Sequence, residues 1–201
     1  MSAAAWHDLC LRAADQRLSP RRFMHALGVC HASVALAAYQ GLDTAAAATA
    51  ALLHDIAKET APEDLRADLE RRGRPLAAED EGFPKLWHPL AAAVWAEQDF
   101  GVFDPDILEA IRLHPTADSG MSALARVVFV ADYTDPTRDW NGVEALRRLA
   151  RADFAAALAE AVRRKVAYVR SRGYTLHPRA LRALAAYAPE APSLVEEGIH
   201  D

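Results

Sequence analysis

Apolar side chains recur at helical spacing along most of this chain, and proline, glycine or a capping side chain separates each such segment from the next. Ser19, Asp43, Asp104 and Ser122 stand directly before four of the segments, where their side-chain oxygens can cap the start of a helix. The pattern predicts a helix that begins at residue 86 and helices over residues 3–18, 20–41, 44–58, 62–72, 105–114, 123–133, 143–150, 153–171 and 178–187.

One segment is ambiguous, because the apolar run over residues 127–130 also fits a buried β-strand. No other segment would pair with such a strand, so we interpret the run as part of a helix. Alanine is abundant and β-branched residues are few and scattered, which also favours helix. The sequence therefore predicts an all-α helical bundle, with a loop over residues 73–84 where glycine, proline and charged residues gather.

The length of 201 residues fits one domain, and 52% hydrophobic with 25% charged residues is typical of a soluble globular protein. We expect a single helical domain over residues 1–189 and a polar C-terminal tail over residues 190–201.

The formal net charge of −5 argues against a protein that binds the phosphate backbone of nucleic acid, because such proteins carry a basic surplus. No window approaches the apolar length of a membrane span, and the first residues do not form a signal peptide. With only two cysteines there is no disulfide framework, so the reducing cytoplasm is the expected location.

The most informative stretch is Leu52-Leu53-His54-Asp55-Ile56-Ala57-Lys58. An imidazole beside a carboxylate can hold a divalent metal. On a continuous helix Lys58 would project from the same side as the pair, so a cation able to bind phosphate would accompany the metal ligands. Taken alone, the pair also fits a capping histidine next to a solvated helix-end charge, and only the other histidines distinguish the two interpretations.

Six side chains of metal-ligand type recur near helix ends, on five different segments: His25, His54, Asp55, His88, His114 and Asp132. A helical bundle can bring such positions to one interior site. Four histidines and two aspartates exceed what one tetrahedral ion needs, so they could serve two ions that share a carboxylate or a hydroxide.

This order of residues resembles the HD-domain metal phosphohydrolases, and within them the YqeK-type symmetrical diadenosine tetraphosphate hydrolases. The resemblance covers roughly residues 20–187 and rests on these stretches: Arg22-Phe23-Met24-His25, Gly41-Leu42-Asp43, the stretch 52–58, Leu86-Trp87-His88, Glu109 to His114, Gly120-Met121-Ser122, and Ala131-Asp132-Tyr133 followed by Arg138.

Three short stretches depart from the pattern of that family. This chain has His114-Pro115-Thr116-Ala117 where the family usually has His-Thr-Thr-Gly, Pro89-Leu90 where it has Gly-Pro, and Thr134-Asp135 where it tends to have Ile-Glu. The six ligand positions are intact, so the departures bear on substrate preference more than on metal binding.

The resemblance implies an HD-domain bundle that hydrolyses diadenosine tetraphosphate to two ADP. It places His25, His54, Asp55 and Asp132 on one metal ion and His88 and His114 on a second. Iron is favoured, and manganese, zinc or cobalt would also suit mixed imidazole and carboxylate ligands. Asp55, Lys58 and Arg138 are then the expected catalytic residues.

Substrate binding is expected from Lys58 and Arg138, which would neutralise phosphate oxygens, and from Thr116, Ser119 and Gly120, which would donate hydrogen bonds. Lys58 and Arg138 could also be ordinary surface charges.

Two other functions fit the same residues: an HD-domain phosphohydrolase that acts on mononucleotides, and a non-catalytic nucleotide sensor. A purely structural bundle would place hydrophobic residues, not histidines, at interior helix ends. A small dinucleoside polyphosphate or nucleotide is the expected partner. A homodimer is compatible with the sequence, although no stretch argues for it.

Overall fold

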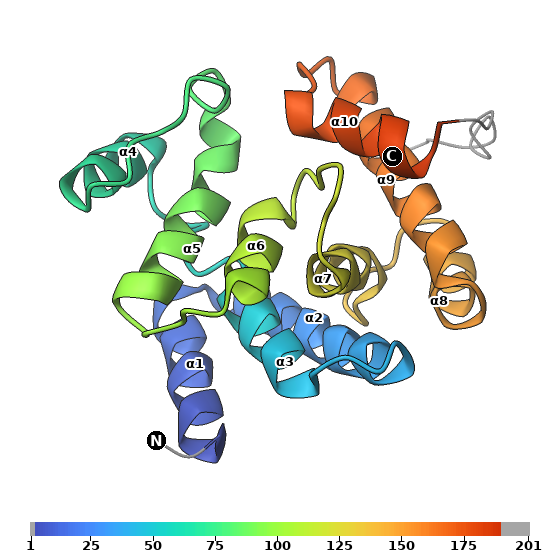
Figure 1. The fold of residues 1–201 in the computed structure, drawn as a ribbon, viewed down its shortest axis with the longest axis horizontal. Coiled ribbons are helices and arrows are strands. Elements are labelled where there is room, and N and C mark those ends of the chain that lie inside the picture. Colours follow the sequence, from blue (N-terminus) through green and yellow to red (C-terminus); the bar gives the residue numbers. More distant parts are fainter. Residues whose placement is uncertain (1–2, 190–201) are drawn as a thin grey trace.

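Ten α-helices make up most of residues 3–189, the part of the chain that the computed structural model describes (Figure 1). They are α1 (Ala3–Arg17), α2 (Pro20–Tyr39), α3 (Thr44–Leu53), α4 (Pro62–Arg71), α5 (Trp87–Gln98), α6 (Pro105–Leu113), α7 (Ala123–Thr134), α8 (Val143–Ala152), α9 (Phe154–Ser171) and α10 (Pro178–Tyr187), with a short 3₁₀ turn, η1 (Pro84–Leu86), before α5. The all-α prediction is confirmed, and the ambiguous run 127–130 lies inside α7.

Three predicted details of the helix ends were wrong. The third helix ends at Leu53, so Lys58 does not extend from it but lies in the following turns. Ser19 precedes α2 but does not cap it, because its backbone N–H and hydroxyl both donate to the carboxylate of Glu59. Helix α5 begins at Trp87, one residue later than predicted, because residues 84–86 form a 3₁₀ turn, and His88 lies in the first turn of the helix.

Helices α2, α3, α6 and α7 meet in the middle of the molecule (Figure 1). Helix α2 packs along both α3 and α7, while α6 bridges α3, α5 and α7. Helices α4 and α5 lie on one side of this centre, and α8, α9 and α10 lie on the other. The central helices therefore converge from distant parts of the sequence.

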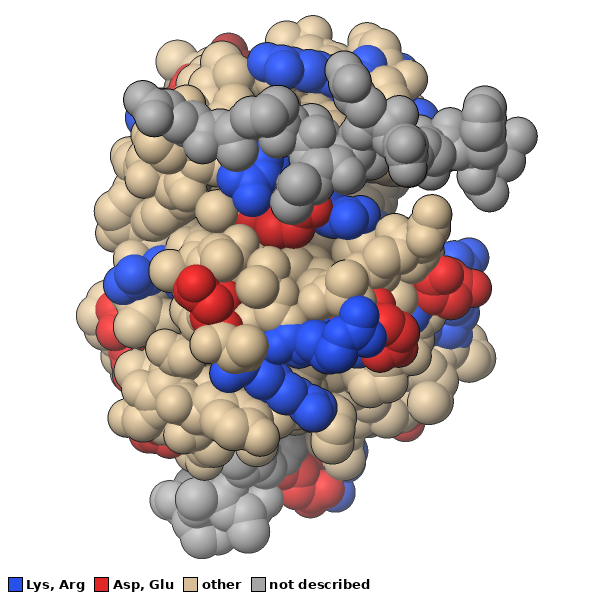
Figure 2. All heavy atoms as spheres, turned by 90° about the vertical axis from the view of Figure 1, so that its right-hand side faces the viewer, with Lys and Arg blue, Asp and Glu red and all other residues tan. Residues whose placement is uncertain are grey.

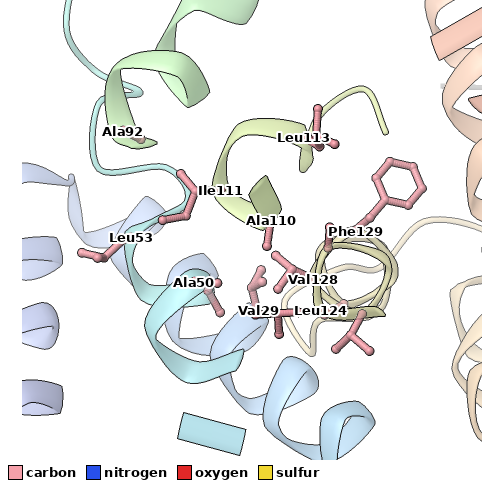
Figure 3. Packing of buried hydrophobic residues seen from close by; sticks show 14 of the residues in the cluster. Val29, Ala50, Leu53, Ala92, Ala110, Ile111, Leu113, Leu124, Val128 and Phe129 are labelled. Carbon is pink, nitrogen blue, oxygen red and sulfur yellow. The ribbon is translucent and has the colours of Figure 1, made fainter. Parts of the chain in front are cut away.

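One cluster of buried apolar side chains receives residues from all ten helices. Near its centre, Val29, Ala50 and Val128 pack where α2, α3 and α7 come together (Figure 3). Alanines at such contacts let helix axes approach closely, and burial of the larger side chains stabilises the bundle by about 1.5–3 kcal/mol each. Because these helices approach closely, the polar residues at their ends, such as His54 after α3 and His114 after α6, lie near one another.

No helix among the described residues is both long and apolar enough to cross a membrane. On the face of the molecule shown in Figure 2, Lys and Arg side chains alternate with Asp and Glu side chains and form no single basic patch. The predicted tail over residues 190–201 lies outside the described residues, so the division of the chain at residue 189 stays a prediction.

Candidate active site

Three histidines at helix ends form the first of two groups of side chains in the site. We call this group the imidazole cluster, and it consists of His54, His88 and His114. His54 and His114 directly follow α3 and α6, and His88 lies in the first turn of α5. Each ring places Nδ1 against the backbone carbonyl three residues earlier, at 2.6 Å for His54, 3.0 Å for His88 and 2.8 Å for His114. The short stretch of chain around each histidine therefore orients its own ring.

These hydrogen bonds determine which ring nitrogen is free. A carbonyl oxygen only accepts, so Nδ1 carries the hydrogen and Nε2 keeps its lone pair. Burial lowers the pKa of His54 to about 4 and that of His88 to about 3, which keeps both rings neutral near pH 7. Neutral Nε2 atoms oriented by an outer hydrogen bond are good metal ligands.

Asp55 lies at the centre of the imidazole cluster. Its Oδ1 is 3.2 Å from Nε2 of His88 and 3.4 Å from Nε2 of His114, and its Oδ2 is 3.7 Å from Nε2 of His54. Although burial opposes its charge, the neighbouring His54, His114, His88 and Lys58 hold the pKa of Asp55 well below its usual value. A carboxylate and several imidazole lone pairs thus converge within a small buried space.

That convergence requires a cation, because lone pairs and a carboxylate repel one another. Nε2 of His54 and Oδ1 of Asp55 are both buried and have no hydrogen-bond partner within residues 3–189. The ammonium nitrogen of Lys58 lies 2.9 Å from Nε2 of His88 and 3.5 Å from Oδ1 of Asp55. It supplies one positive charge but leaves the two unpartnered atoms unsatisfied.

A second group, the carboxylate arm, faces this cluster and consists of His25, Asp132, Asp135 and Arg138. Nε2 of His25 is 3.2 Å from Asp132, and its Nδ1 is 3.2 Å from Asp135. Arg138 contacts the same two carboxylates, at 2.6 Å and 3.0 Å. Burial would lower the pKa of His25, but the two carboxylates raise it to about 9.

Two residues outside the site hold Asp135 in place. A Cβ on Gly28 would lie 2.7 Å from Oδ1 of Asp135, so only glycine lets this carboxylate approach α2 so closely. Arg147 of α8 donates to the backbone carbonyls of Thr134, Asp135 and Arg138, at 2.9, 2.6 and 2.8 Å. Tertiary contacts therefore position the carboxylate arm.

Both groups contain sets of side chains that could hold a metal ion. Three such sets have ligand atoms within 4.8 Å of one another: His25 with His54 and Asp55, Asp55 with His88 and His114, and His25 with Asp132 and Asp135. Asp55 belongs to two of the sets, as expected for a carboxylate shared by two ions.

The structure brings the six predicted ligand residues together at one place, with Lys58 and Arg138 beside them. The three predicted hydrogen-bond donors lie in the loop between α6 and α7, and they differ in how buried they are. Thr116 is buried and its hydroxyl has no partner within the described residues, while Ser119 and Gly120 are exposed. Ala117 has a φ of +56°, a left-handed conformation at the position where the family pattern has glycine.

Sequence analysis missed Asp135 as part of this site and Arg147 as a residue that supports it from outside. Asp135 follows Asp132 by three residues, and that helical spacing was an available signal. No local signal identifies Arg147, because its role depends on the packing of α8 against α7. His31 and His177, which the pattern left without a role, lie outside the metal-ligand sets of the described residues.

Comparison with known proteins now decides the family. The family model described as HD domain matches residues 22–137, which include all six ligand positions. The chain belongs to the HD-domain family. Divalent metals are the ions that HD domains bind, and the histidine and aspartate sets of this chain fit them. Helices α8, α9 and α10 follow the matched segment.

Curated relatives of this HD-domain chain share a common name. A protein of Bacillus subtilis named symmetrical bis(5'-nucleosyl)-tetraphosphatase is 33% identical over 168 residues, 84% of this chain and 90% of the relative. A protein of Halalkalibacterium halodurans with the same name is 30% identical over 173 residues, 85% of this chain and 91% of the relative.

A solved structure shares the fold as well. The crystal structure from Clostridium acetobutylicum, described as a predicted HD superfamily hydrolase involved in NAD metabolism, matches with a TM-score of 0.82 and 33% identity. The match covers 88% of this chain and 93% of the other.

Proposed function

We propose that this HD-domain protein hydrolyses diadenosine tetraphosphate symmetrically to two ADP, in a metal-dependent reaction. The observation that carries the proposal is the convergence of the imidazole cluster and the carboxylate arm around Asp55, with Lys58 and Arg138 at the same place. The shared name of the relatives at 30–33% identity supports the choice of substrate and of cleavage position.

We assign His25, His54, Asp55 and Asp132 to one metal ion and His88 and His114, with Asp55, to a second. The unpartnered Nε2 of His54 and Oδ1 of Asp55, and the three ligand sets around them, fit such ions. Bound divalent metal supplies hydroxide at neutral pH by lowering the pKa of water to about 7, and it neutralises phosphate charge. Iron is the metal we favour, with manganese, zinc and cobalt as the alternatives to compare.

The chain's own residues provide positioning and charge. Phosphoanhydride hydrolysis depends on holding a multiply charged chain in line with the attacking oxygen and stabilising the charge that develops. Lys58 and Arg138 bind phosphate oxygens in this proposal, and their contacts with Asp55 and Asp132 hold both cations at the site. Thr116 has a buried hydroxyl that is available as a further donor.

A product assay with purified protein tests the proposal. The protein is loaded with iron, manganese, zinc or cobalt and incubated with diadenosine tetraphosphate, with and without chelator. We expect ADP as the only nucleotide product, no turnover with chelator, and no turnover for His54→Ala or Asp55→Ala. His31→Ala, which changes an exposed histidine of α2, is the matched control and should retain activity.

Other outcomes would redirect the proposal. ATP together with AMP would reject symmetrical cleavage while keeping the metal site. Bound metal without turnover of the dinucleotide would favour hydrolysis of mononucleotides, which the altered residues around Pro115 and Ala117 make the second candidate. Absence of both metal and turnover would favour a nucleotide sensor.

A further inference from the structure

Arg22, in the first turn of α2, reaches the centre of the site. Its Nη1 lies 3.8 Å from Oδ2 of Asp55, and its Nε lies 3.3 Å from Oε1 of Glu59. The Arg22 side chain is 39% exposed, whereas the Asp55 side chain is only 5% exposed. Arg22 therefore extends from the solvent to the buried carboxylate that two of the metal-ligand sets share.

Glu59 holds the guanidinium of Arg22, and Ser19 holds Glu59. The backbone N–H of Ser19 donates to Oε2 of Glu59 at 2.6 Å, and the Ser19 hydroxyl donates to Oε1 at 2.7 Å. Ser19 makes these bonds in place of the side-chain cap that its position before α2 would allow. The residues at the start of α2 thus fix the position of Arg22 through Glu59.

The contact with Asp55 leaves most donors of Arg22 free. At 3.8 Å it is too long for a hydrogen bond, so Arg22 and Asp55 attract each other only as charges. Asp55 also has Lys58 at 3.5 Å, together with the three rings of the imidazole cluster. Within residues 3–189 Arg22 has only Asp55 and Glu59 as partners, and neither accepts a hydrogen bond from its two Nη atoms.

Arg22 and Lys58 flank the two oxygens of Asp55. The ammonium of Lys58 lies near Oδ1, and the guanidinium of Arg22 lies near Oδ2. Both cations are partly exposed, as is Arg138, which contacts Asp132 in the carboxylate arm. Three cations that solvent can reach therefore border the carboxylates to which we assign metal ions.

The charges of the site favour a polyanion once metal is bound. The charged side chains in contact there are Asp55, Glu59, Asp132 and Asp135 on one side and Arg22, Lys58, Arg138 and His25 on the other. Even with His25 neutral, a single divalent ion leaves a positive surplus. A chain of phosphates neutralises such a surplus.

We propose that Arg22 is a phosphate-binding residue of this site and donates from its free Nη atoms to the phosphate chain of the substrate beside Asp55. A guanidinium suits this role because its parallel N–H donors match the oxygens of a phosphate. The proposal rests on the proposed function, since it assumes a substrate with a chain of phosphates. Ser19 and Glu59 are then positioning residues, because they act through Arg22.

Binding of inorganic tripolyphosphate tests this role without turnover of the dinucleotide. Calorimetry compares the wild type, Arg22→Gln and Arg21→Gln, each loaded with Mn²⁺ and kept in excess Mn²⁺. We expect binding at least about 10-fold weaker for Arg22→Gln, as for loss of one charged hydrogen bond. Arg21→Gln removes the same charge from the adjacent, exposed position and should bind as the wild type does.

Mn²⁺ affinity separates phosphate binding from support of Asp55. Arg22→Gln removes a positive charge near a proposed metal ligand, so it should bind Mn²⁺ as tightly as the wild type or more tightly. Retained Mn²⁺ binding also shows that the variant is folded. Weaker Mn²⁺ binding would mean that Arg22 positions Asp55 for the metal, and it would overturn the proposal.

Two results of the tripolyphosphate titration would overturn the proposal as well. The first is equal affinity in Arg22→Gln and the wild type. The second is an equal loss in Arg22→Gln and Arg21→Gln, which would reduce the effect to net charge.

Ser19→Ala tests the positioning role, because it removes a hydrogen bond to Glu59 without a change of charge. We expect a few-fold loss of tripolyphosphate affinity in the wild-type background. In the Arg22→Gln background we expect no further loss, since no guanidinium remains to be positioned. An equal loss in both backgrounds would reject the positioning role of Ser19 and Glu59.

The KM for diadenosine tetraphosphate distinguishes this proposal from the function on which it rests. If the wild type is active and Arg22→Gln has an unchanged KM, only the role of Arg22 is rejected. If the wild type binds tripolyphosphate through Arg22 but leaves the dinucleotide intact, the proposed substrate is rejected and the phosphate-binding role stands.

Discussion

The imidazole cluster and the carboxylate arm hold their histidines by different means. His54, His88 and His114 each bond through Nδ1 to a carbonyl three residues earlier, so the local backbone orients the ring. His25 instead lies between Asp132 and Asp135, which come from the other end of the matched segment. Local contacts orient one group, and the packing of α7 against α2 orients the other.

This difference also sets the charge of the rings. A backbone carbonyl has no net charge and cannot offset the cost of burial, so His54 and His88 stay neutral. Two carboxylates more than offset that cost for His25, whose pKa rises to about 9. A single site thus contains rings ready to bind metal beside a ring that must release a proton before it can do so.

The substitution Asp55→Asn tests the residue that both groups share, and we expect the largest effect from it. The amide keeps the shape but loses the charge that two of the three ligand sets use. Loss of several kcal/mol of metal-dependent stabilisation corresponds to about a 10³-fold decrease in kcat. Metal content and product formation are measured together, with the exposed Asp139→Asn as control. Wild-type metal content in Asp55→Asn would contradict a shared ligand.

The dependence of stability on pH separates the two groups in chelator-treated protein. His54 binds a proton less readily when folded (pKa about 4, against 6.5), so stability should fall as pH decreases from about 6.5 towards 4. His25 binds one more readily when folded (pKa about 9), so its contribution should be lost as pH rises through 9. Each effect is roughly 3 kcal/mol, at about 1.4 kcal/mol per pKa unit.

Urea unfolding between pH 4 and pH 10 measures both effects. In His25→Asn the alkaline decrease should disappear while the acid decrease stays. An unchanged alkaline decrease in that variant would show that another group is responsible.

The substitution Asp135→Asn weakens the carboxylate arm alone. Outer partners of metal-binding histidines typically contribute 10- to 100-fold to metal affinity or activity, and we expect a loss in that range. The imidazole cluster offers no equivalent change, because its outer partners are backbone carbonyls. Metal affinity is measured by titration with Mn²⁺, again against Asp139→Asn. Equal affinity in the two variants would remove Asp135 from the site.

The substitution Gly28→Ala should have the smallest effect and shows whether the close approach of Asp135 to α2 matters. The added Cβ must displace the Asp135 carboxylate, so we expect a few-fold loss of Mn²⁺ affinity, although alanine favours the helix by about 0.5–1 kcal/mol. In the Asp135→Asn background the same change should cost less, because the charged contact to His25 is already gone. Additive losses in the double variant would mean that Gly28 acts elsewhere.

Much of this molecule can be predicted from short stretches of sequence. Proline and capping residues mark the starts of α4, α6, α7 and α10 close to where they occur, and the side chains of Asp43, Asp104 and Ser122 cap helices as expected. The His-Asp pair and the other histidines at helix ends identify the ligand set before any fold is known. These features depend on contacts within a few residues, which the order of amino acids specifies directly.

Other features depend on which helices become neighbours. Lys58 lies in the turns after α3, where its N–H donates to the carbonyl of Asp55, but its ammonium meets His88 only because α5 packs beside those turns. Asp135 needs the space beside Gly28, and Arg147 binds the carbonyls of a segment from another helix end. Contacts between distant segments form when the helices pack, so spacing along the chain could locate the ligands but not the residues that support them.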